Sequence, residues 1–250
     1  MLAVIGGSGF GRWDALCVTG RSHADTAWGV PSAPLVRGSV AGCEVLFLAR
    51  HGDPHRIAPH LINYRANIAA LRDAGVRRVV AFASVGGIAG GLGAGSIVVP
   101  DGILDYTHSR AHTFVDEQVE AVAHIDFTHP FEPRLRASLL AAAARAGIAV
   151  REGGTYAATQ GPRLESAAEV RRLERDGADI VGMTGMPEAA LAREAGLAYA
   201  MLAVVANDAA GKGESEQSVA LEAAQARFDA GMAAAREVLL ALLRGEAENT

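Results

Sequence analysis

Cysteine is scarce in this sequence. Cys17 and Cys43 are the only two among 250 residues, and they form neither a CxxC pair nor the spacing of a zinc site. A disulfide framework or a structural zinc centre needs more cysteine or histidine ligands at short spacing. We therefore expect a protein of a reducing compartment that binds no metal ion.

Basic patches and long apolar runs are also missing. The chain has 23 Lys and Arg against 28 Asp and Glu, a net charge of −5, and the basic residues are scattered. Nucleic-acid surfaces gather basic side chains, so we expect no nucleic-acid partner. No apolar run reaches the roughly 18 residues of a membrane-spanning helix. The opening residues MLAVIGGSGF lack the basic start of a signal peptide, so we expect no membrane partner and a cytoplasmic location.

Linkers and repeats are absent as well. No Pro- or Ser-rich stretch divides the chain, and half of its residues are hydrophobic. A chain of this length and composition can bury a large core. We therefore predict a single domain over residues 1–250.

Short apolar runs alternate with segments of helical spacing. The expected strands cover residues 4–7, 45–52, 77–87, 96–100, 178–184 and 202–207. The expected helices cover residues 61–75, 134–147, 166–177, 187–196 and 218–244. This alternation indicates an α/β fold whose sheet is covered by helices on both faces. Residues 101–133 carry four histidines with little periodicity, which is typical of a functional or interface loop.

Four predicted strands end in residues of similar chemistry. These ends are Gly-Gly-Ser-Gly at 6–9, Arg50-His51-Gly52, Ser84-Val85-Gly86-Gly87 and Met183-Thr184. Open α/β sheets bind ligands at the carboxyl ends of their strands. Hydroxyls, glycine-freed N–H groups, an Arg and a His together suit a small oxyanion such as phosphate. Taken alone, GGSG is an ordinary turn, and Arg12 breaks the GxGxxG pattern of a dinucleotide site.

Several long motifs carry a family resemblance. They are GGSGF, RHGDPHRIAPHLINYRANIAAL, the SVGGI turn, TQGPRLESAAE and GADIVGMTGMPEAALAREAG. Together, from residue 2 to about residue 240, they resemble the trimeric purine nucleoside phosphorylase and methylthioadenosine phosphorylase family. The resemblance implies a central mixed β-sheet flanked by helices, phosphorolysis of a nucleoside, and a homotrimer. It implies no cofactor, with inorganic phosphate as co-substrate.

The resemblance assigns the phosphate site to the polar strand ends. Ser8, Arg50, His51 and Thr184 stand where the family holds phosphate, and Ser84 stands where the backbone contributes. Arg50 and His51 are therefore expected to be catalytic residues.

The resemblance also assigns the residues around ribose and base. Met183 matches the wall of the ribose, and Leu164 stands where the family usually stacks a Phe on the purine. Glu165 and Asn207 match the positions that read the base, and Asn207 is the third expected catalytic residue. The neighbouring residues expected to touch substrate are Asp208 and Ala209.

The 5′ end of the substrate is assigned in the same way. His124 corresponds to a histidine that closes this end of the neighbouring subunit's site. Val219, Ala220 and Ala223 stand where oxopurine-cleaving members supply a histidine, so an apolar methylthio group suits this lining better than a hydroxyl. Tyr156 is either a neighbour that supports the site or an ordinary core aromatic.

Asn207 indicates which base is cleaved. An amide offers one acceptor and two donors, whereas an ionised Asp only accepts. The amide suits N7–H and O6 of a 6-oxopurine, while adenine-cleaving relatives have Asp-x-Asp where this sequence has Asn207 and Ala209. Glu165 can accept from N1–H of hypoxanthine, although some adenine-cleaving relatives also carry Glu. Together with the apolar 5′ lining, these residues predict phosphorolysis of 5′-methylthioinosine to hypoxanthine and 5-methylthioribose 1-phosphate.

Other functions stay open at this point. Within the class, they are cleavage of methylthioadenosine and general cleavage of 6-oxopurine nucleosides. A non-catalytic nucleoside-binding protein is disfavoured, because binding a base needs no phosphate clamp. A nicotinamide-dependent oxidoreductase is disfavoured by the broken glycine pattern and by the lack of an acidic ribose ligand about 20 residues further on.

Overall fold

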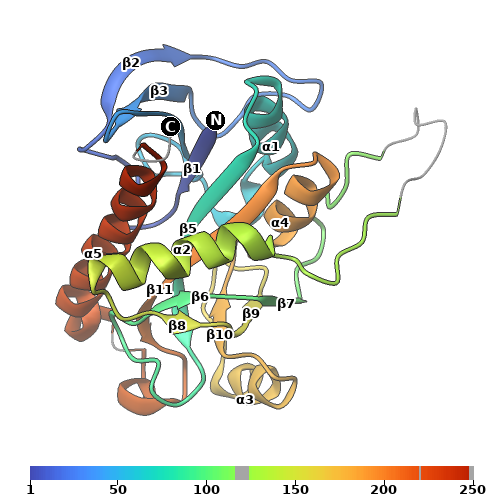
Figure 1. Cartoon of the computed structure of the whole chain (residues 1–250). Coiled ribbons are helices and arrows are strands. Elements are labelled where there is room, and N and C mark those ends of the chain that lie inside the picture. The colour runs from blue at the N-terminus through green and yellow to red at the C-terminus, as the bar shows by residue number, and fades with distance from the viewer. Residues whose placement is uncertain (116–123, 220, 248–250) are drawn as a thin grey trace.

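The computed structural model describes residues 1–115, 124–219 and 221–247 (Figure 1). Within these residues, eleven strands form one sheet. The strands are β1 (Leu2–Gly6), β2 (Cys17–Ser22), β3 (Leu35–Val40), β4 (Cys43–Ala49), β5 (Arg78–Gly87), β6 (Ile97–Val99), β7 (Gly102–Asp105), β8 (Arg151–Glu152), β9 (Thr155–Ala158), β10 (Ile180–Gly182) and β11 (Ala198–Asp208). The α-helices are α1 (Tyr64–Asp73), α2 (Pro133–Ala146), α3 (Ala167–Arg175), α4 (Gly185–Glu194) and α5 (Leu221–Ala247).

The sheet is mixed, and β5 is its central strand. Its main path runs β2-β3-β4-β1-β5-β10-β9-β7, while β11 pairs with β5 and β6, and β6 pairs with β8. Strands β4, β1, β5 and β11 are parallel to one another. Strand β10 is antiparallel to β5 and pairs only with its last two residues, Gly86 and Gly87. The prediction of an α/β fold with a central mixed sheet flanked by helices is confirmed.

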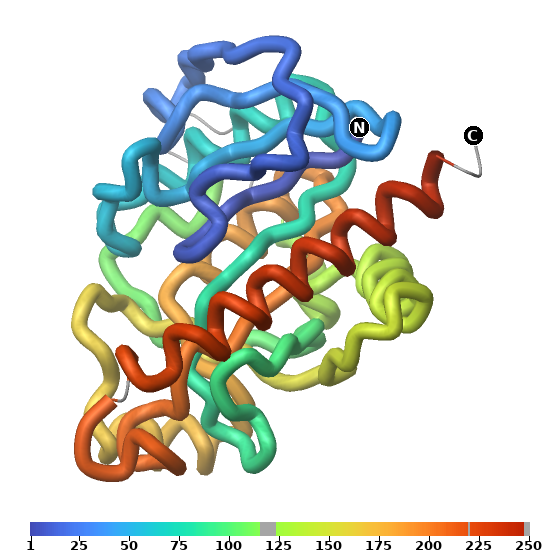
Figure 2. The backbone as a smooth tube through the Cα atoms, turned by 90° about the vertical axis from the view of Figure 1, so that its left-hand side faces the viewer, coloured from blue at the N-terminus to red at the C-terminus, as the bar shows by residue number. Residues whose placement is uncertain are grey.

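Helices cover both faces of the sheet because side chains alternate along each strand. Ala3 and Ile5 of β1 belong to the same apolar cluster as residues of α1 and α4. Leu2 and Val4 belong to a second cluster, on the opposite face, with residues of α2 and α5. Figures 1 and 2 show α5 as a long helix that runs across this second face, and α2 packs against it.

Helix ends follow the capping signals in the sequence. Ser166 and Glu169 form the predicted capping box, with side-chain to backbone hydrogen bonds in both directions. The predicted helix at 61–75 begins later, at Tyr64, because the Asn63 side chain accepts from the backbone N–H of Ala66 and caps it there. The C-terminal helix likewise begins at Leu221 rather than 218.

Other predictions about the strands need correction. The glycine turn expected to close the strand at 77–87 is instead part of β5, because β10 and β11 pair with Gly86 and Gly87. The predicted loop at 101–133 begins with strand β7, which pairs with β9. Strand β2 was missed because it lies at an edge of the sheet, mostly exposed, and so lacks apolar alternation.

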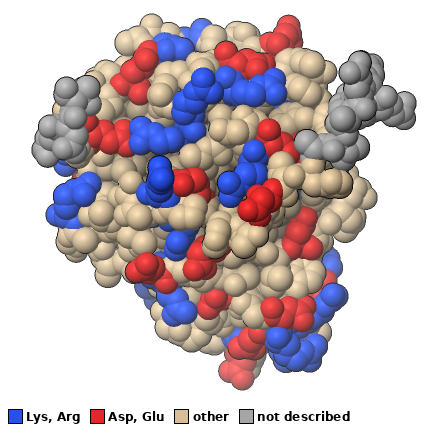
Figure 3. Space-filling model, turned by 45° about the vertical axis from the view of Figure 1, so that its right-hand side comes forward, with Lys and Arg blue, Asp and Glu red and all other residues tan. Residues whose placement is uncertain are grey.

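The surface carries both signs of charge. On the face shown in Figure 3, Lys and Arg lie intermingled with Asp and Glu. Among the described residues, none of the helices is long and apolar enough to cross a membrane.

Candidate active site

A cavity opens where the polar ends of β1, β4, β5, β10 and β11 meet. Its lining includes eleven of the residues predicted from the sequence: Ser8, Arg50, His51, Ser84, Leu164, Glu165, Met183, Thr184, Asn207, Ala209 and Val219. They come from segments far apart in the chain. The sheet topology therefore brings the predicted phosphate, ribose and base residues to one place.

The cavity lies beside a gap in the sheet. On one edge of β5, pairing with β1 ends at Ala81 and pairing with β10 begins at Gly86. The carbonyl of Phe82 lies in this gap and accepts from Arg50 Nη1 at 2.8 Å. Backbone groups point to the same edge at every second residue of a strand, so the N–H of Ser84 also faces this gap. Ser84 lines the cavity.

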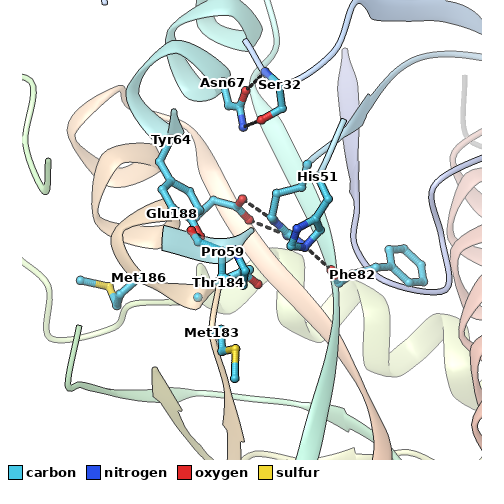
Figure 4. Close-up of polar contacts among 12 residues, drawn as sticks. Ser32, His51, Pro59, Tyr64, Asn67, Phe82, Met183, Thr184, Met186 and Glu188 are labelled. Carbon is cyan, nitrogen blue, oxygen red and sulfur yellow. Dashed lines mark hydrogen bonds and ion pairs between the residues drawn. The ribbon is translucent and has the colours of Figure 1, made fainter. Parts of the chain in front are cut away.

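Arg50 is fully buried at the end of β4 and paired with a carboxylate. Dashed lines from the carboxylate of Glu188 in Figure 4 mark this pairing. Its Nε and Nη2 donate to the two oxygens of Glu188 at 2.6 and 2.7 Å, and both side chains have no exposed surface. Burial opposes the charged guanidinium, but the adjacent Glu188 carboxylate outweighs it and raises the pKa of Arg50 above its ordinary value. Three of the five guanidinium N–H groups are used by Glu188 and Phe82, which leaves two for a ligand.

His51 is neutral and has a fixed tautomer. Burial lowers its pKa to about 4, and the positive charge of Arg50 and the neighbouring His55 add to this effect. The ring stacks on His55 with centroids 4.3 Å apart. Its Nδ1 lies 2.8 Å from the carbonyl oxygen of Ile57. Because a carbonyl only accepts, Nδ1 carries the proton and Nε2 is a hydrogen-bond acceptor.

Tyr156 supports the end of β10. Its hydroxyl accepts from the backbone N–H groups of Thr184 and Gly185 at 3.2 and 3.3 Å, and its ring is fully buried. A Cβ on Gly182 would lie 2.2 Å from the same hydroxyl, so glycine is required there. Tyr156 is therefore both a core aromatic and the residue that holds Thr184 beside the cavity, which joins the two roles left open by the sequence.

Glu165 and Asn207 are also held by protein partners. Glu165 Oε1 accepts from Thr159 Oγ1 at 2.5 Å. Asn207 is 8% exposed, and its Nδ2 donates to the backbone carbonyl of Asp208 at 2.6 Å. This contact leaves Oδ1 and one N–H of the Asn207 amide available to a ligand. Leu164 is 45% exposed at the edge of the cavity.

Two predicted residues lie away from the cavity. Asp208 follows Asn207 in β11 and points to the other side, where its carboxylate accepts from the backbone N–H of Glu214. Ala223 is exposed on the first turn of α5, and Leu221 lines the cavity in its place. Ala220 lies outside the described residues.

His124 is exposed and does not line the cavity of its own chain. Its predicted role belongs to a neighbouring subunit, so this placement leaves that role a prediction.

The sequence interpretation missed two supporting residues. Glu188 is the only charged residue in the buried run GMPEAALA of α4, and a lone carboxylate in such a run is a signal of a buried ion pair. No sequence pattern indicated a supporting role for Arg110, because it lies in the irregular segment after β7. Its guanidinium donates to the backbone carbonyls of Met183, Met186 and Gln160 at 2.6–2.8 Å and thereby fixes the chain around the cavity. Within the described residues, no group of three or more His, Cys, Asp or Glu side chains is arranged to hold a metal.

In this α/β fold, a guanidinium, an imidazole and hydroxyl side chains line the same cavity as a buried amide and a carboxyl group. A model of the phosphorylase superfamily matches residues 1–244, and the chain belongs to this family. The family resemblance seen in the motifs is thereby confirmed.

Individual relatives are similar over most of the chain. A protein of Xanthomonas campestris pv. campestris named probable S-methyl-5′-thioinosine phosphorylase is 48% identical, covering 98% of this chain and 97% of its own. One of the same name from Pseudomonas syringae pv. tomato is 53% identical, covering 84% and 85%. Methylthioadenosine phosphorylase from Schistosoma mansoni, solved in complex with adenine, is 32% identical with a TM-score of 0.92, covering 99% of this chain and 92% of its own.

The neutral state of His51 predicts a loss of stability in acid. The unfolded chain takes up a proton near the ordinary pKa of 6.5, whereas the folded protein does so only near about 4. Stability from this group is therefore complete above pH 6.5 and is lost as the pH falls through 4, a change of about 3 kcal/mol in unfolding free energy. The unfolding free energy can be measured with urea at about pH 7.5 and 4.5. It should decrease less between these pH values for His51→Gln than for the unchanged protein.

His23→Gln is the matched control, because His23 is exposed and its replacement should leave the pH dependence unchanged. If the unfolding free energy of all three proteins decreased equally between the two pH values, a buried neutral His51 would be contradicted.

Proposed function

We propose that this protein cleaves S-methyl-5′-thioinosine with inorganic phosphate, forming hypoxanthine and 5-methylthioribose 1-phosphate. The observation that carries the proposal is Asn207, a buried amide with one free acceptor and one free N–H in a cavity that also contains a phosphate-type donor set. The names of the bacterial relatives agree with this substrate.

The reaction displaces the purine from C1′ of the sugar. A phosphate oxygen forms the new bond to C1′ while the bond from C1′ to N9 breaks, and the electron pair of that bond leaves with the purine. Positive charge develops on the sugar ring, which the adjacent phosphate anion stabilises. In the balanced reaction the proton of hydrogen phosphate ends on the departing base at N7, and the hydrogen on N7 is where an acceptor from the protein is needed.

The donors for phosphate are the two free N–H groups of Arg50, the hydroxyls of Ser8 and Thr184, and the N–H of Ser84. His51 contributes the opposite function: its Nε2 accepts, so it suits the protonated oxygen of a hydrogen phosphate. This division of donors and acceptors matches HPO₄²⁻, an anion with one O–H and three acceptor oxygens.

The base side of the cavity suits hypoxanthine. Asn207 Oδ1 can accept from N7–H, and its free N–H can donate to O6. Glu165, held by Thr159, can accept from N1–H. Leu164 gives an apolar wall for the ring.

The 5′ side suits a methylthio group. Val219 and Leu221 both line the cavity and bring no hydrogen-bonding side chain. Met183 lies between this side and the phosphate residues in the proposed arrangement and covers the ribose. An apolar sulfur-methyl group matches this lining, while a 5′-hydroxyl would lose its water without a partner.

Cleavage of methylthioadenosine is the second candidate. The same apolar lining at Val219 and Leu221 suits its identical 5′ group, and the structural neighbour from Schistosoma mansoni carries that name. The two candidates differ only in the base, so Asn207 decides between them.

Release of base from methylthioinosine, methylthioadenosine, inosine and adenosine, each with and without phosphate, tests the proposal. We expect release to require phosphate and to be fastest with methylthioinosine. Equal release without phosphate would indicate hydrolysis, and preference for inosine would assign a general 6-oxopurine activity.

Exchanging Asn207 should change the base preference. With adenine bound, the donor of Asn207 faces the N6 amino donor, and a buried mismatch of this kind can reject the wrong substrate by roughly 10⁴-fold in kcat/KM. Asn207→Asp should narrow or reverse the preference for methylthioinosine over methylthioadenosine, and adding Ala209→Asp should extend the change. Leu164→Phe is the control, since it alters the wall of the base without changing polarity at C6.

Equal kcat/KM for the two substrates in the unchanged protein would show that Asn207 does not read C6. The function would then be cleavage of methylthioadenosine.

We further propose a cytoplasmic homotrimer in which His124 closes the 5′ end of the neighbouring site. Leu164 and Leu221 support this arrangement, because both line the cavity and yet are 45% and 49% exposed in the single chain. Large apolar side chains exposed together at a cavity edge indicate a surface that another chain covers.

A complementation experiment tests the shared site. Arg50→Ala and His124→Ala should each impair turnover, but trimers reassembled from both variants should contain some sites with intact Arg50 and the partner's intact His124. Activity of the mixture should exceed the sum of the separate variants by several-fold. Purely additive activity, or a monomer in sedimentation, would contradict the proposal.

A further inference from the structure

The anion side of the cavity has no net charge on the protein. Arg50 contributes one positive charge, and Glu188 cancels it at 2.6 Å with both side chains fully buried. His51 is neutral because burial lowers its pKa to about 4. Ser8 and Thr184 add only hydroxyls. The negative charge of a phosphate bound here would therefore not be offset by a net positive charge on the protein.

Both carboxylate oxygens of Glu188 accept hydrogen bonds from protein groups. Its Oε1 accepts from Arg50 Nη2 and from the hydroxyl of Tyr199 at 2.8 Å, and its Oε2 accepts from Arg50 Nε. Tyr199 is buried, and burial beside this carboxylate raises the pKa of its hydroxyl, which keeps it a neutral donor. The carboxylate thus fixes one edge of the Arg50 guanidinium, and the carbonyl of Phe82 fixes another.

The desolvation cost of a buried ion pair can exceed the attraction between its charges, so stability alone is a weak explanation for a buried carboxylate. A backbone carbonyl is enough to orient one N–H of Arg50, as Phe82 shows. What Glu188 adds beyond orientation is its negative charge. That charge acts at the guanidinium of Arg50, which lines the cavity and has two N–H groups that Glu188 and Phe82 do not use.

We propose that Glu188 is a positioning residue that also cancels the charge of Arg50. Phosphate is then held by hydrogen-bond donors, and no net protein charge offsets its negative charge during the reaction. This inference rests on the proposed phosphorolysis. Its consequence is that phosphate binds less tightly in the ground state and stabilises the positively charged sugar more strongly in the transition state.

Glu188→Gln tests this by removing the charge while keeping a side chain of the same shape. The uncancelled guanidinium should bind phosphate more tightly and should oppose positive charge on the sugar. At an effective dielectric constant of about 20, a unit charge as far as about 12 Å away still changes an equilibrium by about tenfold, and a nearer charge changes it by more. We expect the KM for phosphate to fall by about tenfold and kcat to fall by at least about tenfold.

Tyr199→Phe is the matched control. It removes a buried hydrogen bond from the same Glu188 oxygen but leaves the charges of Glu188 and Arg50 in place. We expect both variants to unfold at lower temperature than the unchanged protein, while only Glu188→Gln shows the opposing changes in phosphate affinity and turnover. A rise in the phosphate KM of Glu188→Gln, or the same kinetic change in both variants, would overturn the proposal.

The unchanged protein provides a second measurement should Glu188→Gln fail to fold. Salt screens the attraction between an anion and a net cationic site, so such a site loses affinity as the ionic strength rises. For a site without net charge, the phosphate KM should change by less than about twofold between roughly 20 and 500 mM KCl. A several-fold rise in KM would overturn the proposal. If the protein cleaves none of the nucleosides with phosphate, the proposed function itself fails, whereas cleavage with the wrong charge dependence rejects only the role of Glu188.

Discussion

The gap in the pairing of β5 is the constraint on which the site depends. Strand β1 pairs with β5 up to Ala81, β10 pairs with it from Gly86, and β11 pairs along its other edge throughout. Between these points, the edge of β5 that β1 and β10 share pairs with no strand in the described part of the chain. Arg50 satisfies one backbone group there, the carbonyl of Phe82. Strand β10 runs antiparallel to β5, so the chain leaving β10 reaches the same gap from the opposite direction. Met183 and Thr184 follow β10 and therefore lie beside this gap.

Arg50, His51 and the backbone of Thr184 are each held by a residue outside the cavity lining. Glu188 holds Arg50, the carbonyl of Ile57 holds His51, and Tyr156 holds the backbone of Thr184. Such contacts fix rotamers and tautomers before a ligand arrives, so little reorganisation is needed on binding. They also set charge: the site combines strong donors with almost no net charge. Arg110 extends this support to the backbone around Met183 from a segment with no regular structure.

Much of the fold and site could be predicted from the sequence because their signals are local. Apolar runs that end in glycine or polar residues located β1, β4, β5 and β11, and capping residues located the ends of helices such as α3. The strand-end residues that suit an anion do line one cavity, as the rule for α/β sheets predicts. The predictions that missed had weak local signals. Edge strand β2 is mostly exposed, and Asp208 differs from Asn207 only in the direction that strand alternation gives its side chain.

The sequence by itself determined the family, the alternation of strands and helices, and the chemical types of the residues at the strand ends. Only the tertiary structure decided how those residues act. Pairing of β10 with β5 brings residues near position 183 beside those near position 84, and burial of Arg50 against Glu188 decides how much charge a bound anion meets. The tautomer of His51 depends on a carbonyl six residues away, in a loop with no repeating pattern. These properties arise from distances and burial between segments far apart or irregular in the chain, and residue spacing alone does not encode them.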